Sequence, residues 1–195
     1  LYGCLEGNTV EQADARQAYV QAKLGGKQTW IELPRELWPA GWSGFRRPVC
    51  LLRMALYGHP DAGGYWEKHS FQKFKEAGFQ PVDSWHSVFW NPKTKVLLTV
   101  YVDDLKAAGP IDAVRQTWKD LKGIDLDPPT EAARYLGCNH TRVKTDDGVE
   151  MHYDMCDFME ACCKRYAEVV GREVNFKPAS TPFLQEDNLT DDDFM

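Results

Sequence analysis

An apolar, β-branched run at Val96–Val100 leads directly into the tetrapeptide Tyr101–Asp104. A second apolar stretch, Leu105–Ala108, follows and is ended by Gly109-Pro110, a pair that interrupts regular structure. Short apolar runs bounded by turn residues are typical of buried strands. The pattern therefore predicts a strand, a tight turn and a return strand, with two adjacent acids at the tip of the hairpin.

Three segments carry apolar residues at helical spacing, so that one side of each would face a core. These segments are 65–77, 111–122 and 154–171. Gly78 and Gly171 are suited to end the first and third helices, and Asp154 is suited to cap the start of the third. Residues 15–23 also have helical character, and Gly25-Gly26 would end that helix.

The remaining patterned stretches predict strands at 10–14, 30–33, 49–53, 83–90, 135–143 and 149–153. Asp146-Asp147-Gly148 is a strong hairpin signal between the last two. Segment 34–47 is rich in Trp, Pro and Gly and predicts a loop. Its aromatic residues could stack on nucleic-acid bases, but we favour the interpretation that they pin the loop to the core. They are Trp38, Trp42 and Phe45.

Helices and strands mixed in this order predict an α+β fold, in which an antiparallel sheet is backed by helices. At 195 residues the chain fits one domain with a small appendage. Because Leu1 is not an initiator methionine, we expect a fragment or a processed piece. No apolar run approaches the roughly 20 residues of a membrane span, so no membrane partner is expected.

The two acids at the predicted hairpin tip are the first candidate for chemistry. Adjacent carboxylates repel each other, and a low local dielectric strengthens the repulsion. A divalent cation would compensate, and oxygen ligands suit magnesium or manganese. Because side chains alternate along a strand, one acid can face a metal site while the other lies at its margin. A simple Asp-Asp turn in water is the alternative.

Asp14 is a second candidate, because it stands at the predicted junction between strand 10–14 and helix 15–23. Free backbone N–H groups and the helix dipole would favour anions there, so metal and phosphate could both lie near Asp14. A plain helix N-cap is the competing interpretation.

The net charge of −6 argues mildly against a nucleic-acid binder, which usually has a basic face. That argument is weakened because four of the acids stand in the final segment of the chain: Asp187, Asp191, Asp192 and Asp193. The six cysteines, without a secretion signal, suggest reduced thiols. His152, Cys156, Cys162 and Cys163 match no standard zinc spacing, and buried helix thiols explain them better than a zinc site does.

Several blocks of the chain together resemble the Ty/copia-type retrotransposon reverse transcriptases. Tyr101-Val102-Asp103-Asp104 is similar to the Tyr-X-Asp-Asp signature of reverse transcriptases. Four further blocks stand in the family's order and roughly at its spacing, and they span nearly the whole chain. They are Asp14-Ala15-Arg16-Gln17-Ala18-Tyr19, Leu56-Tyr57-Gly58 with Trp66, Tyr135-Leu136-Gly137 (a strand in the family), and Thr181-Pro182.

The resemblance implies an RNA-directed DNA polymerase that joins a deoxynucleotide to a primer 3′ hydroxyl. It implies a polymerase palm with partial fingers at 1–153, the start of a helical thumb at 154–177, and an extended acidic tail at 178–195. Asp14, Asp103 and Asp104 would be the catalytic ligands of two Mg²⁺ ions, or of Mn²⁺.

By the same resemblance, three residues would contact the incoming nucleotide: Ala15 through its carbonyl, which would also ligate metal, Arg16, and Tyr19. The Tyr19 ring would select against a 2′ hydroxyl, although a core tyrosine on a helix is the simpler interpretation. Tyr101 and Val102 would lie against the primer terminus, and the hairpin around residues 146–148 would grip the primer strand.

The implied partners are an RNA template, a DNA primer, dNTPs, and the integrase and RNase H parts of a polyprotein. The implied location is intracellular, in a cytoplasmic virus-like particle or in the nucleus. Asp61 stands where the family has an amide, so no nucleotide role is assigned to that loop. Because finger and thumb segments are missing, we expect this piece to bind metal but to polymerise poorly.

Two other interpretations remain. A decayed or repurposed palm could serve as an RNA- or protein-binding module, and a different palm enzyme such as a nucleotide cyclase would share the fold. Polymerase palms, RNA-recognition modules and cyclases all use this architecture, so fold alone does not decide the function.

Overall fold

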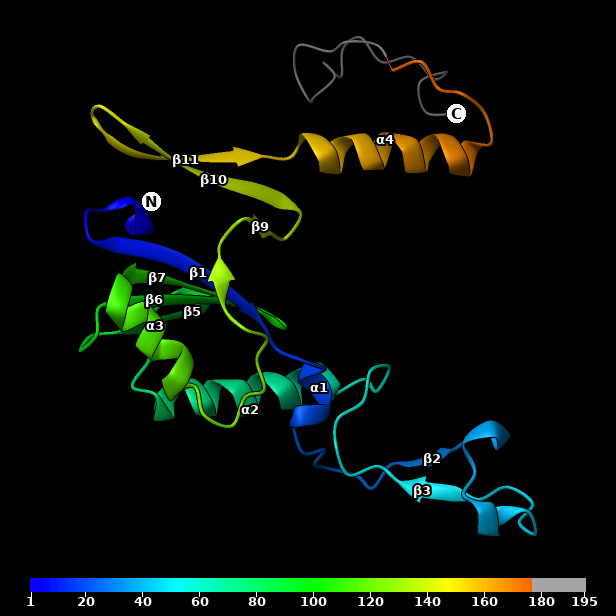
Figure 1. Ribbon diagram of the computed structural model, residues 1–195. Helices are drawn as coiled ribbons and strands as arrows, with labels where there is room; N and C mark the ends of the chain where they lie inside the picture. The colour runs from blue at the N-terminus through cyan, green and yellow to red at the C-terminus, as the bar shows by residue number, and fades with distance from the viewer. Residues whose placement is uncertain (177–195) are drawn as a thin grey trace. The chain divides into compact units, whose positions relative to one another are not determined.

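The computed structural model describes residues 1–176 (Figure 1). By its internal contacts the chain divides after Asp154 into a first unit, Leu1–Asp154, and a second unit that begins at Met155. The first unit holds all the strands and three of the four α-helices that the described residues form. The mixed composition, with antiparallel sheets, confirms the α+β class.

The largest sheet has six strands in the order β4-β5-β6-β7-β1-β8, and every neighbouring pair is antiparallel. The strands are β1 (Asn8–Asp14), β4 (Gln80–Val82), β5 (Trp85–Asn91), β6 (Val96–Tyr101), β7 (Asp104–Pro110) and β8 (Thr130–Glu131). The predicted hairpin at the tetrapeptide is confirmed, since β6 and β7 pair from Leu97–Ala108 to Tyr101–Asp104.

The core lies between this sheet and two helices, α2 (Ala62–Glu76) and α3 (Ile111–Asp120). Alternate residues of β7 are buried, beginning with Leu105, as expected of a strand with one covered face. Phe74 of α2 packs edge-on against Phe89 of β5, with ring centroids 5.1 Å apart. The expected sheet backed by helices is therefore present, and β7 points its other face away from this core.

The helix predicted at 15–23 is mostly wrong, because α1 covers only Ala18–Gln21. The backbone N–H of Ala15 donates to the carbonyl of Asp103 (2.8 Å), and that of Arg16 donates to the carbonyl of Asp125 (3.0 Å). Gln17 is left-handed, with φ of 48°. Residues 15 and 16 therefore make hydrogen bonds to neighbouring segments, as strand residues do, instead of starting a helix. The single turn of α1 is too short to provide the anion site that was expected at a helix start beside Asp14.

The strand predicted at 135–143 is broken in two, β9 (Arg134–Tyr135) and β10 (Cys138–Thr145). Leu136 and Gly137 both have positive φ, 50° and 80°, and they form a two-residue hairpin turn in which Tyr135 pairs with Cys138. The expected Tyr-Leu-Gly strand is therefore a turn. β10 pairs with β11 (Gly148–Asp154) across Asp146-Asp147, as the turn signal predicted.

The predicted strands at 30–33 and 49–53 form a two-stranded sheet, β2 (Trp30–Glu32) and β3 (Val49–Leu51). The loop between them contains two short 3₁₀ helices, η2 (Arg35–Leu37) and η3 (Ala40–Trp42); a third, η1 (Tyr2–Cys4), precedes β1. The aromatic residues of the loop between β2 and β3 make contacts within that loop. The Trp38 indole donates to the Leu33 carbonyl (2.8 Å), and the Trp42 and Phe45 rings meet edge-on. They do not join the core cluster, so the expectation that they pin the loop to it is wrong.

In the second unit, α4 spans Cys156–Val170 and ends at Gly171, which is left-handed as a helix C-cap requires (φ 71°). Met155 occupies the N-cap position, so the expected cap at Asp154 is one residue off; Asp154 ends β11 instead. The predicted tail at 178–195 lies outside the described residues. None of the six cysteines, all of which are described, forms a disulfide.

Candidate active site

Asp14 and Asp104, far apart in the sequence, are direct partners in the antiparallel pairing of β1 with β7. Directly opposed residues of a β-ladder place their side chains on the same face of the sheet. Asp14 is the last residue of β1 and Asp104 is the first residue of β7. Because the two strands are antiparallel, both acids lie at the same edge of the sheet. The core residue Leu105 belongs to the opposite face, so the two carboxylates lie on the face that the core helices leave uncovered.

Asp103 lies beside this pair, in the two-residue turn that joins β6 to β7. Its carbonyl accepts the backbone N–H of Ala15 at 2.8 Å, which ties the turn to the residue after Asp14. The structure thus brings Asp14, Asp103 and Asp104 to one sheet edge. Asp103 occupies the turn, and Asp104 has entered the strand.

The turn that carries Asp103 is strained and braced. Val102 has a φ of 55°, a left-handed conformation that is unfavourable for a β-branched residue. The indole N–H of Trp66, a core residue of α2, donates to the Val102 carbonyl at 2.6 Å. Strained residues of this kind persist where the surrounding structure holds them, and they are frequent at functional sites.

The clustered acids disturb one another's ionisation. Burial and the charges of Asp103, Asp104 and Asp127 raise the pKa of Asp14 above its ordinary value. Burial and the charge of Asp103 likewise raise the pKa of Asp104. Among residues 1–176, Arg16 pairs with Asp127, but no Lys or Arg forms an ion pair with Asp14, Asp103 or Asp104. These three acids therefore leave negative charge at the edge that a bound cation would stabilise.

Asp127 is a fourth acid at this edge, one that no sequence pattern predicted. Its backbone N–H donates to the Asp14 carbonyl at 2.8 Å, and it lines a cavity of about 220 Å³ together with Asp14 and Asp104. Its segment adds one β-bridge, Ala15 to Leu126, beside β1. No local pattern reveals this, because Asp127 belongs to a loop that only the fold brings to the end of β1.

Arg16 is engaged by acids rather than free for a phosphate. Its Nε donates to Asp127 Oδ1 at 2.6 Å, and its Nη1 lies 3.5 Å from Asp125 Oδ1. Gln21 donates to the carbonyls of Arg16 and Asp125 and accepts the N–H of Asp125. The predicted nucleotide contact by Arg16 would have to displace these interactions, although all three side chains are about half exposed or more.

Tyr19 stacks on Tyr57, with ring centroids 4.3 Å apart and planes 27° from parallel. Burial raises the pKa of Tyr57, and the charges of Asp103 and Asp14 also contribute, so the aromatic pair lies within electrostatic reach of the acids. Tyr57 belongs to the Leu-Tyr-Gly block, for which the sequence suggested no role at the site. Tyr101 and Val102, the predicted primer contacts, are 59% and 42% exposed.

Among residues 1–176, no group of three or more His, Cys, Asp or Glu side chains is already gathered closely enough to enclose a metal ion. The side chains that could hold one are Asp14, Asp103 and Asp104. Their carboxylate oxygens are the hard ligands that Mg²⁺ and Mn²⁺ prefer, and their mutual repulsion fits a cation site.

The raised pKa values predict a stability effect with a definite sign. Below the ordinary pKa of an aspartate, both folded and unfolded chains hold the proton; above it the unfolded chain releases its proton first. Stability therefore falls as the pH rises through the window between the ordinary pKa and the raised one. Asp104→Asn should remove this penalty, so its melting temperature should exceed that of the unsubstituted chain at pH 7 in EDTA.

Thermal denaturation from pH 3 to pH 7 would measure the difference between the two proteins, which should grow with pH. Asp112→Asn, on the exposed first turn of α3, is the matched control and should show no such growth. A difference that shrinks as the pH rises would contradict the assignment of a raised pKa to Asp104.

No helix among the described residues has the length and apolar character needed to cross a membrane.

Comparison with known proteins identifies no relative: no family model, no curated protein and no solved structure matches the chain.

Proposed function

We propose that the chain is the palm-centred part of a Ty/copia-type reverse transcriptase, which adds deoxynucleotides to a primer on an RNA template. One observation carries the proposal: Asp14 and Asp104 face each other across β1 and β7, with Asp103 in the adjoining turn. Nucleotidyl transfer through two metal ions needs carboxylates from separate segments at one point.

In this proposal Asp14, Asp103 and Asp104 would hold Mg²⁺ or Mn²⁺. The bound ions would stabilise the charge that develops on the attacking and leaving oxygens. The chain's part is positional: the β1–β7 ladder fixes Asp14 against Asp104, and the bond from Ala15 N–H to the Asp103 carbonyl fixes the turn. The Trp66 indole holds Val102, so the whole tip is preorganised before substrate binds.

The primer would lie along the exposed side chains of Tyr101 and Val102, next to the acids. The deoxynucleotide would lie near Ala15 and Tyr19, and the Tyr19 ring stacks on that of Tyr57. Arg16 would reach a phosphate only by leaving Asp125 and Asp127. Template, primer, dNTPs and the integrase and RNase H parts of a polyprotein are the proposed partners, in a virus-like particle or the nucleus.

A second candidate is a palm that binds RNA or protein without catalysis. Two observations favour it. Arg16 is held in ion pairs with Asp125 and Asp127. Among the described residues, no three His, Cys, Asp or Glu side chains lie close enough together to enclose a metal ion. Asp61, which precedes α2 in the loop near Tyr57, would also repel a triphosphate.

Binding of Mn²⁺, followed by electron paramagnetic resonance, separates the two candidates. The polymerase proposal expects the chain to bind Mn²⁺ in competition with Mg²⁺, and to bind dNTP more tightly on primed RNA when the metal is present. The binding-module candidate expects RNA binding that persists in EDTA with no uptake of Mn²⁺. That second result would overturn the polymerase proposal.

A further inference from the structure

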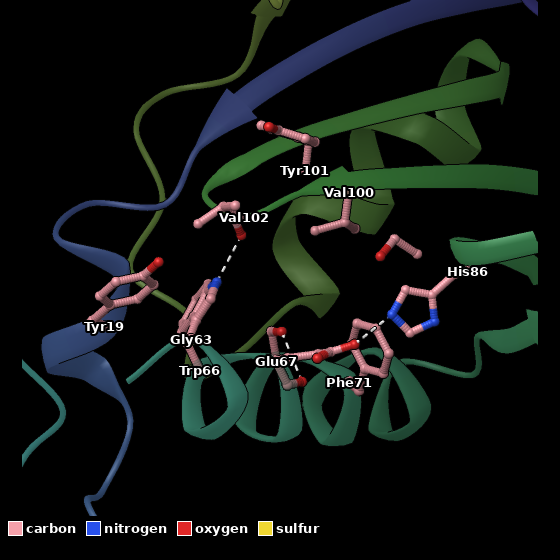
Figure 2. A pocket seen from close by; sticks show the side chains of 11 residues that line it. Tyr19, Gly63, Trp66, Glu67, Phe71, His86, Val100, Tyr101 and Val102 are labelled. Carbon is pink, nitrogen blue, oxygen red and sulfur yellow. Dashed lines mark hydrogen bonds and ion pairs between the residues drawn. The ribbon is translucent and has the colours of Figure 1, made fainter. Parts of the chain in front are cut away.

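A separate cavity of about 310 Å³ lies between α2 and the β5–β6 part of the large sheet (Figure 2). It shares no lining residue with the cavity beside Asp14 and Asp104. It reaches the hairpin turn from the other side, because Tyr101 and Val102 form part of its wall. Its volume is at the lower end of the range for small-molecule sites, so it suits one small ring system.

The wall of this cavity is mainly aromatic. Tyr19, Trp66 and Phe71 contribute rings, and Val100 adds an aliphatic surface. Trp66 is almost fully buried (2% exposed), and its indole is fixed by the bond to the Val102 carbonyl. The partly buried rings of Tyr19 and Phe71 offer flat apolar surfaces, against which a planar ligand loses little entropy on binding.

The polar groups of the cavity gather on one side. Glu67 Oε1 lies 2.8 Å from His86 Nε2, and the Ser70 hydroxyl donates to the Glu67 backbone carbonyl. No described residue hydrogen-bonds the second carboxylate oxygen of Glu67, so that oxygen is available as an acceptor. A carboxylate in such a cavity selects a ligand that carries a hydrogen-bond donor.

We propose that this cavity is a binding site for a planar heteroaromatic amine the size of a single purine. The flat ring would lie against the aromatic wall, and its exocyclic amino group would donate to the Glu67 carboxylate. The aromatic surfaces and the acceptor have no other joint use in the fold described here. None of the three acids lines the cavity, whereas Tyr19, Tyr101 and Val102, which the polymerase proposal assigns to nucleotide and primer, do line it.

A ligand in this cavity would also act on the hairpin. It would contact Tyr101 and Val102 directly and would pack beside Trp66, which holds the Val102 carbonyl. If a ligand here changed the affinity of the acids for an ion, the ion would change the affinity for the ligand by the same factor.

The test uses 2-aminopurine, a fluorescent heteroaromatic amine, titrated with the 195-residue chain. We expect saturable quenching of its fluorescence, because aromatic contacts quench the probe. Purine, which lacks the amino group, should compete about tenfold more weakly than adenine, because it cannot form the charge-assisted hydrogen bond from that group to Glu67. Equal competition by purine and adenine, or no saturable quenching, would overturn the proposal.

Two variants and one spectrum locate the site. Glu67→Met, which removes the acceptor at similar length, should weaken 2-aminopurine binding about tenfold. Glu76→Met, on the same helix but outside the cavity, should leave binding unchanged. In the unsubstituted chain, ligand should shift the NMR resonance of the Trp66 indole N–H. A Trp66 resonance that stays in place at saturation would refute the site even if Glu67→Met fails to fold.

Discussion

If the proposed polymerase function is correct, Asp103→Asn should abolish nucleotide addition while the fold is retained. A neutral amide is a poorer metal ligand than a carboxylate, and metal ions contribute several kcal/mol of stabilisation to such a transition state. Since each 1.36 kcal/mol is a factor of ten in rate, we expect a loss of about 10³-fold or more. The rate would be measured by primer extension on RNA with the polyprotein that the proposal implies. The affinity for Mn²⁺ would be measured on the 195-residue chain.

The fold should survive this change because Asp103 supports the structure through its backbone. The bond to Ala15 uses the Asp103 carbonyl, which asparagine keeps. Circular dichroism and the melting temperature should therefore match those of the unsubstituted chain. Asp120→Asn, at the exposed end of α3 and outside the cavity beside Asp14 and Asp104, is the control and should retain activity. Full activity of Asp103→Asn would remove the metal-ligand role.

Phe89→Ala should destabilise the first unit by about 3–5 kcal/mol, a large part of the stability of a typical domain. Phe89 is 1% exposed, and its ring meets those of Phe71 and Phe74 at centroid distances of 4.7 and 5.1 Å. Alanine would leave a cavity between α2 and β5 that neighbouring elements can fill only in part. Urea denaturation followed by tryptophan fluorescence would give the change in free energy of unfolding.

Phe45→Ala provides the comparison. Phe45 is 58% exposed and outside the core cluster, and its described ring contact is with Trp42. We expect a loss of no more than about 1 kcal/mol. Similar losses for the two variants would mean that Phe45, and with it the loop between β2 and β3, is more deeply packed than the structure shows.

The sequence predicted those elements in which the local pattern and the tertiary packing agree. The run from Val96 has both the apolar residues and the turn residues of a hairpin, and β6 and β7 form there. The stripe of Trp66 and Phe74 predicted α2 because helical spacing alone gathers such residues on one side. Gly171 ends α4 because glycine adopts the left-handed conformation without steric cost.

The predictions failed where a distant partner outweighs local preference. Residues 15–17 have helical character, yet the carbonyls of Asp103 and Asp125 hold the N–H groups of Ala15 and Arg16 in an extended path. The pattern over 135–143 predicts a single strand through Leu136-Gly137, but β9 and β10 pair through a tight turn at that point. In both cases the deciding hydrogen bonds are set by the fold.

The candidate site shows the same division. The sequence by itself determined that Asp103 and Asp104 stand at a hairpin tip and that Asp14 ends a strand, because alternation and turn residues are local signals. Only the tertiary structure decided that Asp14 lies opposite Asp104, that Asp127 joins them, and that Arg16 is paired with acids. Strand register and loop placement depend on contacts between segments remote in sequence, and no local pattern encodes them.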